Sequence, residues 1–376
     1  MALLEIMATM DIGVISYNMS VFSAMGNKEA KFASEYSFLQ RAGVVNLGDM
    51  KVTNFFINSL VHLESTRKRL DAKVIGIQEF HQPTLELIKK NLNNSNFVYH
   101  PFSKKITNDA AVLTIWDARV LGEMVSAYDE DLGSTVGVEG VITDPSARPN
   151  DLGRPISIIK TTKGYTLINF HGINRPKYNA TGGENGVDNS AILKALIVKH
   201  ADLAGLADVD AHKIIVMCDS NDREHGINSE APLTINGVGL HDGRVQADRE
   251  ATSCCYNWDS CGIPISGGKV TLGAVGAEAQ YKYTGDYVLG ATVKTPVKAE
   301  GSVLDIDGAS VESDHKLVYA VLSVNSEYIT EANAALAAEP NSQEGGKRQT
   351  KRQNQRQSRQ SRQSRQSRQS RQSRRR

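Results

Sequence analysis

The chain has 376 residues, 40% of them hydrophobic and 23% charged, a composition typical of a globular protein with a sizeable core. No apolar run reaches the roughly 18 residues that a membrane-spanning helix needs, and the N-terminus MALLEIMATM lacks the basic flank of a secretory signal. The formal net charge is +1 and the four cysteines fit no zinc-site spacing, so we expect a monomeric cytoplasmic or nuclear protein, not a secreted one.

Short β-branched apolar runs predict strands, taken here in chain order. They cover Ile12–Tyr17, Val74–Gln78, Ala111–Ile115, Ile156–Ile159, Thr166–Phe170, Ile214–Met217, Tyr287–Leu289 and Leu317–Leu322. Helical spacing of apolar residues predicts helices over Val52–Leu70, Thr84–Leu92 and Asn189–Leu206. Lys163-Gly164 predicts a hairpin turn, because glycine supplies the positive φ that tight turns need. Strands that alternate with both helices and hairpins favour an α/β sandwich of mixed sheets.

The second half of the chain changes in composition twice. The segment Gly237–Gly276 is rich in glycine, serine and cysteine, and we expect it to form surface loops beside an active site. After a last helical pattern near Ala338, the chain repeats Arg-Gln-Ser and has no apolar residue to bury, so it is expected to be disordered. We assign residues 1–10 to an N-terminal extension, 11–325 to a catalytic domain, 326–340 to a helical linker and 341–376 to the disordered tail.

Charge separates the tail from the rest of the chain. Lys347–Arg376 holds 13 basic residues and no acidic one, which leaves 30 basic against 42 acidic residues elsewhere, a net charge of −12. Such a tail binds phosphates without reading sequence, so we expect DNA or RNA as its partner; a localisation signal or a solubilising extension is the alternative. The tail residues expected to contact nucleic acid are Arg348, Arg352, Arg356, Arg359, Arg362 and Arg365.

Six polar motifs fall at or beside the ends of the predicted strands. In chain order they contain Asn18, Glu79, His171, the pair Asp219 and Asn221, Asp286, and the pair Asp314 and His315. Each motif alone has an ordinary structural explanation, such as a strand leaving the core, a hydrogen-bonded histidine or an Asx turn. Their common position at strand ends favours a shared site instead.

Together these residue types suit the hydrolysis of an anionic phosphoester. Its charge must be neutralised by a metal or by fixed donors, and Mg²⁺, with Mn²⁺ as an alternative, prefers carboxylate oxygens such as those of Glu79 and Asp314. Asp219 and Asn221 offer a carboxylate and an amide within one short loop, which is the form needed to orient a water. His315 with a second carboxylate, Asp286, could donate to a phosphate oxygen or move a proton.

The ordered set N, QE, H, D-x-N, D-Y-V-L and SDH, from about Ile12 to Val324, resembles the endonuclease/exonuclease/phosphatase superfamily of DNase I-like enzymes. The resemblance implies a four-layer α/β sandwich of two mixed β-sheets flanked by helices. It also implies a role for each residue, as follows: Glu79, Asn18 and Asp314 at the metal, His171 and Asn221 at the phosphate, Asp219 at the water, Asp286 positioning His315, and His315 stabilising the transition state.

The sequence departs from the family's pattern at three positions. Cys218 replaces the usual glycine before the D-x-N aspartate, Ser20 stands where apurinic endonucleases sometimes have an acid, and Thr284 stands where many relatives have arginine. These departures affect the subfamily more than the chemistry. They leave open which phosphoester the chain would cleave.

The resemblance and the tail together favour a nuclease that cleaves DNA or RNA. A phosphatase for phosphoinositides or other small phosphoesters is the second hypothesis, although the Trp and Arg signatures of the inositol phosphatases are absent. A non-catalytic nucleic-acid-binding protein with a degenerate site is the third, and it would predict the loss of Glu79, Asp219, Asp286 or His315. The serines of the tail lie in basic surroundings that a kinase could use, and their phosphorylation would weaken nucleic-acid binding.

Overall fold

The computed structural model describes residues 9–20, 44–47, 50–104, 110–132, 154–173, 189–221, 232–244, 254–256, 281–283, 285–301, 313 and 315–326. The chain divides into two units, Met1–Ser326 and Glu327–Arg376, and every described residue belongs to the first. Asp314, Thr284 and the arginine tail lie outside the described residues.

One sheet has six strands in the order β16-β17-β1-β4-β6-β5. In chain order these are β1 (Thr9–Asn18), β4 (Ala72–Phe80), β5 (Phe97–Pro101), β6 (Ala111–Asp117), β16 (Val293–Glu300) and β17 (Leu317–Asn325). β1 and β4 run parallel, whereas the other neighbours are antiparallel, so the sheet is mixed. β1 begins within the segment that the sequence assigns to an N-terminal extension, because Thr9 pairs with Asn325.

The other sheet has five strands in the order β15-β10-β9-β8-β7. They are β7 (Met124–Asp131), β8 (Pro155–Thr161), β9 (Thr166–His171), β10 (Ile214–Asp219) and β15 (Asp286–Leu289). Only β9 and β10 run parallel, so this sheet is mixed too. The predicted hairpin joins β8 to β9: Gly164 has φ 78° and its N–H donates to the carbonyl of Thr161 over 2.9 Å.

The helices and small strand pairs lie outside the two sheets. The α-helices are α4 (Asn54–Leu70), α5 (Leu85–Leu92), α6 (Ala118–Leu121) and α7 (Asn189–Leu203), and the 3₁₀ helices are η1 (Gln82–Thr84) and η4 (Ala211–Lys213). Three two-stranded pairs complete the described elements: β2 (Val44–Leu47) with β3 (Met50–Thr53), β11 (Leu233–Ile235) with β12 (Val238–Leu240), and β13 (Cys254–Tyr256) with β14 (Tyr281–Tyr283). None of the described helices combines the length and apolarity that a bilayer crossing requires.

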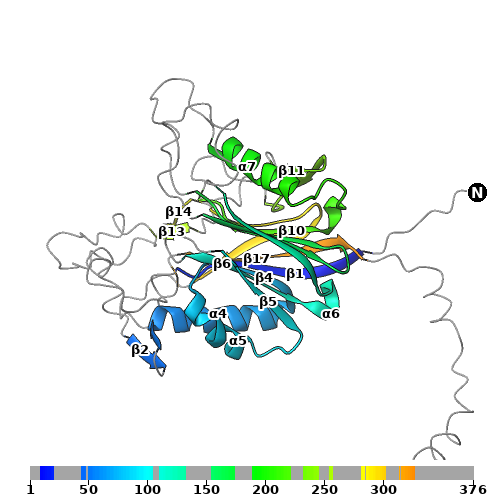
Figure 1. Cartoon of the computed structure of the whole chain (residues 1–376). Coiled ribbons are helices and arrows are strands. Elements are labelled where there is room, and N and C mark those ends of the chain that lie inside the picture. Colours follow the sequence, from blue (N-terminus) through cyan, green and yellow to red (C-terminus); the bar gives the residue numbers. More distant parts are fainter. Residues whose placement is uncertain are drawn as a thin grey trace, which may run out of the picture. The chain divides into compact units, whose positions relative to one another are not determined.

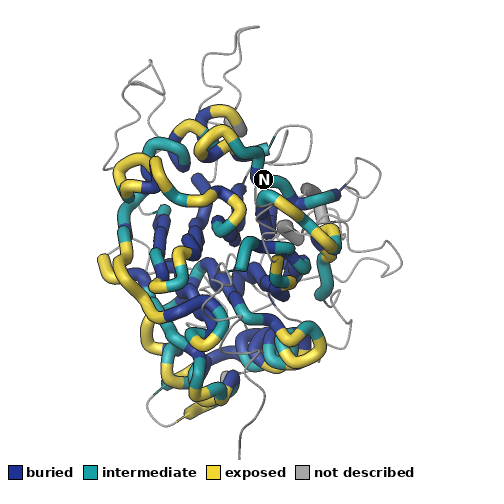
Figure 2. Tube along the Cα trace, turned by 90° about the vertical axis from the view of Figure 1, so that its right-hand side faces the viewer, coloured by how far each residue is buried: buried dark blue, intermediate teal, exposed yellow. Residues whose placement is uncertain are grey.

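The elements stack in four layers, with α7 on one outside, the two sheets in the middle and α4 with α5 on the other outside (Figure 1). Three apolar clusters fill the spaces between the layers. The first joins α7 to the five-stranded sheet, the second joins α4 and α5 to the six-stranded sheet, and the third lies between the sheets. The inner strands are accordingly buried, whereas the edge strands β7 and β16 include exposed residues (Figure 2). This arrangement confirms the predicted sandwich of mixed sheets.

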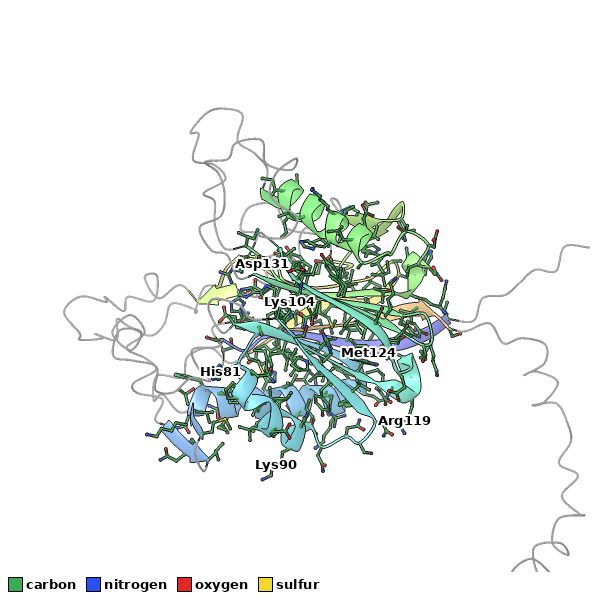
Figure 3. All side chains as sticks on the ribbon, viewed as in Figure 1. His81, Lys90, Lys104, Arg119, Met124 and Asp131 are labelled. Carbon is green, nitrogen blue, oxygen red and sulfur yellow. The ribbon has the colours of Figure 1, made fainter. Side chains whose placement is uncertain are left out.

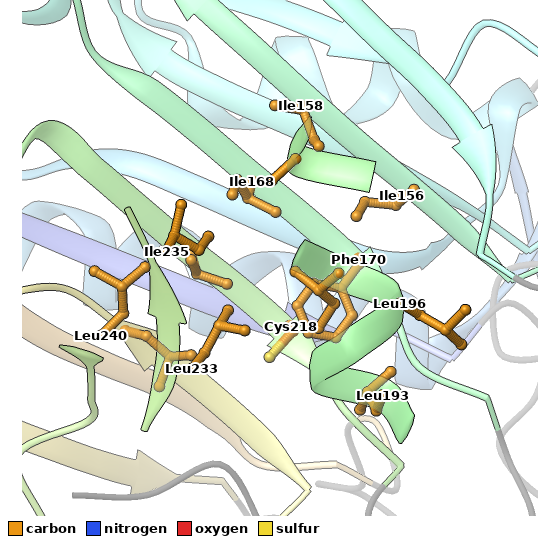
Figure 4. Packing of buried hydrophobic residues seen from close by; sticks show 14 of the residues in the cluster. Ile156, Ile158, Ile168, Phe170, Leu193, Leu196, Cys218, Leu233, Ile235 and Leu240 are labelled. Atoms are coloured by element: carbon orange, nitrogen blue, oxygen red, sulfur yellow. The ribbon is translucent and has the colours of Figure 1, made fainter. Parts of the chain in front are cut away.

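Cys218 belongs to the cluster under α7, where it packs near Phe170 and Leu196 (Figure 4). It is a buried free thiol, and burial raises its pKa well above the ordinary value for cysteine. The residue that replaces the family's usual glycine is therefore a neutral side chain of the core.

Two boundary predictions were wrong in detail. The helix expected from Val52 begins at Asn54, because Thr53 ends β3 and caps α4 by accepting a hydrogen bond from the Phe56 N–H over 3.3 Å. The helix expected to reach Leu206 ends at Leu203, where the chain turns at Gly205 with φ 69°.

The prediction of surface loops over Gly237–Gly276 was also wrong for its described part. Val238–Leu240 is a strand, and the charged residues Asp242 and Arg244 are buried. The charged surface lies elsewhere: Lys90 and Arg119 project outward from the layers (Figure 3). The glycine-rich composition alone could not distinguish a buried turn from an exposed loop.

Candidate active site

Three of the predicted site residues form one row across the five-stranded sheet. The backbone register pairs Asp219 with His171 on one side and with Asp286 on the other. Along β10, Ile215 and Met217 face the other sheet, so alternation directs Asp219 to the same face. His171, Asp219 and Asp286 are all buried, and they lie at the end of the space between the sheets.

The opposite sheet contributes Asn18 and Glu79, which end the parallel strands β1 and β4. Asn18 follows Ile12 and Val14 in alternation and therefore also faces the five-stranded sheet. Glu79 lies where the register of β4 against β6 shifts between Ile77 and Phe80, and its φ is 51°. A bulge of this kind redirects a side chain out of the normal alternation.

Asn18 connects the two sheets. Its Nδ2 donates to Asp219 Oδ2 over 2.9 Å and lies 3.3 Å from His315 Nε2. Its Oδ1 accepts from the Ser20 N–H over 2.9 Å, so the side chain is held at both ends. The amide therefore has one fixed orientation, with its nitrogen toward the buried carboxylate and histidine.

His315 is held by Asp286. His315 Nδ1 lies 3.0 Å from Asp286 Oδ2 and 3.1 Å from Oδ1, and its Nε2 lies 3.8 Å from Asp219 Oδ2. A carboxylate can only accept, so Nδ1 carries a proton and Nε2 is directed toward Asp219. The Ser313 hydroxyl supports this loop by donating to the Asn18 carbonyl over 2.6 Å.

The loop after β10 is shaped by Asp219 and Asn221. The Asn221 N–H donates to Asp219 Oδ1 over 2.9 Å, and Asn221 has φ 52°. Its Nδ2 donates to the Gly172 carbonyl over 3.1 Å, and the Gly172 N–H donates to the Asp219 carbonyl over 2.6 Å. A Cβ at Gly172 would lie 2.0 Å from the Ser220 carbonyl oxygen, so only glycine permits this approach of the two loops.

Burial and charge set the protonation of the central carboxylate. Burial alone would raise the pKa of Asp219, but His315, His171 and the Asn18 amide together outweigh it and lower that pKa. The pKa of His171 is lowered by burial and then by Arg154. Asp219 is therefore ionised and His171 neutral near neutral pH.

Arg154 is a site residue that the sequence reasoning missed. Its Nη1 lies 2.7 Å from His171 Nε2 and 3.0 Å from His171 Nδ1, and its Nε is buried without a hydrogen-bond partner. The other described arginines, Arg67, Arg69, Arg119 and Arg244, each pair with a carboxylate, whereas Arg154 pairs with none within the described part of the chain. An arginine two residues before a predicted strand was the available signal, but it resembles any charged strand border.

A polar layer that the sequence reasoning also missed lies beneath the site, between the sheets. Gln78 Nε2 donates to Asn169 Oδ1 over 2.8 Å, and Asn169 Nδ2 donates to the Leu113 carbonyl over 3.0 Å. These buried amides link β4, β9 and β6 just behind Glu79 and His171. In the sequence both stand within or beside apolar runs, a position typical of ordinary strand residues.

The structure thus brings seven predicted residues together: Asn18, Glu79, His171, Asp219, Asn221, Asp286 and His315. Asp314 and the tail arginines lie outside the described residues. Glu79 Oε1 and Asp219 Oδ2 lie 3.8 and 3.4 Å from His171 Nε2, so His171 stands between the two carboxylates.

The donors fit a divalent cation. Asp219, Asp286 and His315 offer ligand atoms that lie within 4.8 Å of one another, and Glu79 adds a carboxylate that is partly open to solvent. Both oxygens of Asp286 lie within 3.1 Å of His315 Nδ1. The oxygen-rich set suits a hard ion.

No protein-family model and no curated protein sequence matches the chain. Its structure is similar to that of an endonuclease/exonuclease/phosphatase from Bacteroides vulgatus, with 12% identity and a TM-score of 0.50 over 84% of this chain and 99% of that one. A family protein from Bacteroides thetaiotaomicron, at 14% identity, has a TM-score of 0.47 over 84% and 99%. Truncated Caenorhabditis elegans TDP2, at 11% identity, has a TM-score of 0.48 over 83% and 97%. The likeness to the Bacteroides vulgatus structure shows that the chain has the endonuclease/exonuclease/phosphatase fold, which its motifs implied.

Proposed function

We propose that the chain is a divalent-metal-dependent hydrolase of phosphoesters. The observation that carries the proposal is the contact of Asn18 with Asp219, which unites the ends of two separate sheets around one buried, ionised carboxylate. Water attack on a phosphoester needs this combination of a fixed base, fixed donors and a cation site. The reaction class is in-line displacement by water with no covalent enzyme intermediate.

Glu79, Asn18 and Asp314 are the residues that we propose to hold Mg²⁺, with Mn²⁺ as an alternative. When bound, the ion neutralises charge on the phosphate and lowers the pKa of water. The bulge at Glu79 supports its part in this, because it turns a carboxylate out of the strand's alternation toward His171. The side-chain oxygen Oδ1 of Asn18 is already oriented, because it accepts a hydrogen bond from the Ser20 N–H.

Asp219 orients the attacking water and accepts its proton, for which an ionised carboxylate is required. Asn221 holds a phosphate oxygen, its position fixed by the Asx turn that Asp219 closes. The same carboxylate therefore shapes the loop and serves the reaction. A change at Asp219 should alter both.

His171 and His315 contact the phosphate from two sides. His315 donates from Nε2 in the charged form that Asp286 stabilises, and so favours the five-coordinate transition state. Arg154 contributes a permanent positive charge beside His171, and its buried Nε is a donor still to be satisfied. The bound phosphate would satisfy it.

Cleavage of DNA or RNA is the activity that we propose first, because the tail supplies the cationic arm that an acidic body lacks. Hydrolysis of phosphoinositides or other small phosphoesters is the second proposal, supported by the partly exposed Arg154 guanidinium beside the buried His171. A non-catalytic nucleic-acid-binding protein is the third, and the presence of Glu79, Asp219, Asp286 and His315 weighs against it.

A substrate panel tests these alternatives. Plasmid, abasic duplex, single-stranded RNA, inositol phosphates and a chromogenic diester are incubated with the full chain in Mg²⁺, in Mn²⁺ and in EDTA. We expect hydrolysis that EDTA abolishes, with polymer substrates preferred. Binding of nucleic acid that is equal with and without EDTA, with no product from any substrate, would favour the binding protein and defeat the enzyme.

A further inference from the structure

Behind the site, Asp242 and Arg244 form a buried ion pair. Arg244 Nε lies 2.7 Å from Asp242 Oδ2, and each side chain is only 1% exposed. The Arg244 N–H also donates to Asp242 Oδ1 over 2.9 Å, across the turn in which Gly243 has φ 71°. The pair is thus built into one tight turn after β12.

This turn packs against the start of β15, where Asp286 lies. Arg244 Nη2 donates to the main-chain carbonyl of Asp286 over 3.3 Å, and its guanidinium carbon lies 5.1 Å from the centre of the Tyr287 ring. The Asp242 carbonyl in turn accepts from the Val297 N–H of β16 over 3.1 Å. Arg244 therefore contacts the two residues that begin β15, and its partner Asp242 is bonded to β16 of the other sheet.

Stability alone is a weak reason for such a pair. Removing two charges from water costs several kcal/mol for each ion, and apolar replacements of buried ion pairs are often neutral or stabilising. The Arg244 guanidinium instead contacts the backbone of Asp286, whose buried side chain offers a ligand atom within 4.8 Å of one from Asp219. Its planar fork fixes the direction of that contact.

We propose that Arg244, held by Asp242, is a positioning residue for Asp286 and, through it, for His315. It fixes the backbone at Asp286 so that both carboxylate oxygens face His315 Nδ1, which in turn directs Nε2 toward Asp219. The expected effect of Arg244 on turnover rests on the proposed function. Its effect on the orientation of the His315 ring does not depend on that function.

The experiment compares two changes at the pair with a matched control elsewhere. Arg244→Lys keeps the charge but loses the fork and the ring contact, and the double variant Asp242→Asn with Arg244→Met removes both charges without leaving one buried alone. The control is Arg67→Met. Arg67 has the same two contacts, with Glu64 at 2.6 Å and the Phe97 ring at 5.6 Å, but lies on α4 away from the site.

Two measurements are made on each full-length variant. Proton NMR follows the Nδ1–H signal of His315, identified as the downfield resonance that is missing in His315→Gln. Steady-state kinetics on the preferred substrate separates kcat from KM, and thermal melting establishes that each variant is folded.

In the double variant we expect the His315 signal to shift or vanish and kcat to fall about 10- to 100-fold with little change in KM, as for partners that orient reacting groups. Arg244→Lys should have a kcat and a His315 signal between those of the double variant and wild type. Arg67→Met should match wild type in both kcat and the His315 signal. An unchanged His315 signal and kcat in folded Arg244 variants, or an equal loss in Arg67→Met, overturns the proposal. If the wild-type chain hydrolyses nothing, the proposed function fails while the NMR result still decides the positioning.

Discussion

Asn18 Nδ2 lies 2.9 Å from Asp219 Oδ2, although 201 positions separate the two residues in the chain. The amide ends a strand of the six-stranded sheet, and the carboxylate ends a strand of the five-stranded sheet. The site therefore forms only when the two sheets dock in register. Either sheet alone would hold only part of the candidate site.

Glu79→Gln should reduce turnover by more than about 100-fold, since removal of a direct ligand costs more than the loss of a group that only orients one. The amide keeps the length of the side chain, so the fold should be retained. Isothermal titration with Mn²⁺ and steady-state kinetics measure the two effects. Glu86→Gln, which changes an exposed glutamate of α5, is the control and should leave both unchanged. Near wild-type activity in Glu79→Gln would refute its role.

His315→Gln and Asp286→Asn should each lower kcat by about 10²- to 10⁴-fold, the range for loss of a proton-transferring group. Because Asp286 acts through its bonds to His315, the double variant should be little worse than the more damaged single variant. The three kcat values measured on one substrate provide the check. Losses that multiply would mean that the two residues act independently.

Gly172→Ala should destabilise the fold by about 1–3 kcal/mol, the cost typical of forcing an extra methyl group into a packed site. The new Cβ would lie 2.0 Å from the backbone oxygen of Ser220, which cannot move without disturbing Asp219 and Asn221. Urea unfolding measures the loss. Gly301→Ala is the control, since the nearest atom there, at 3.1 Å, belongs to the flexible side chain of Lys316. Equal stability of the two variants would contradict the close approach.

Stability should fall as pH decreases below about 6.5, partly because of His200. Burial lowers the pKa of His200, which lies between Tyr128 Oη at 3.0 Å and the Leu132 carbonyl. Below the ordinary histidine pKa, His200 binds a proton in the unfolded chain but not in the folded chain. The free energy of unfolding therefore falls by at most about 1.4 kcal/mol per pH unit, until the pH reaches the pKa of His200 in the folded chain. Urea melts of wild type and His200→Gln from pH 7.5 to 5 should diverge in slope, and parallel curves would exclude this contribution.

Removal of Lys347–Arg376 should leave hydrolysis of a small diester unchanged and raise KM for polymer substrates. The 13 positive charges of that segment contribute only where many phosphates are within reach. The truncated chain should also show a weaker dependence of KM on salt. Equal KM values for polymer with and without the segment, measured at low salt, would contradict the hypothesis that Lys347–Arg376 binds the polymer substrate.

The buried strands could be predicted from the sequence because apolar runs such as Ile214–Met217 leave few alternatives. Three of the edge strands, β5, β7 and β16, could not. β7 has exposed residues at Met124 and Val125, and β16 includes Pro296, which an edge strand tolerates because one of its sides needs no partner. β7 and β16 are strands because they pair with β8 and β17, and the local sequence pattern does not indicate that pairing.

The site was predictable as a set of motifs but not as a geometry. Asn18, Asp219 and His315 could be chosen because carboxylates, amides and histidines at strand ends have a chemical meaning. Arg154 and Arg244 could not, because one looks like a strand border and the other like part of a glycine-rich loop. Their importance depends on what lies beside them in space, His171 and Asp286.

The left-handed backbone at Glu79 reduces the stability of the folded chain. A residue other than glycine or asparagine at φ 51° is strained by about 1–3 kcal/mol, and this strain accompanies the direction in which the Glu79 carboxylate points. Glycine there would relieve the strain and remove the proposed ligand together. Selection of this chain for heat resistance alone would therefore favour the loss of the carboxylate at residue 79.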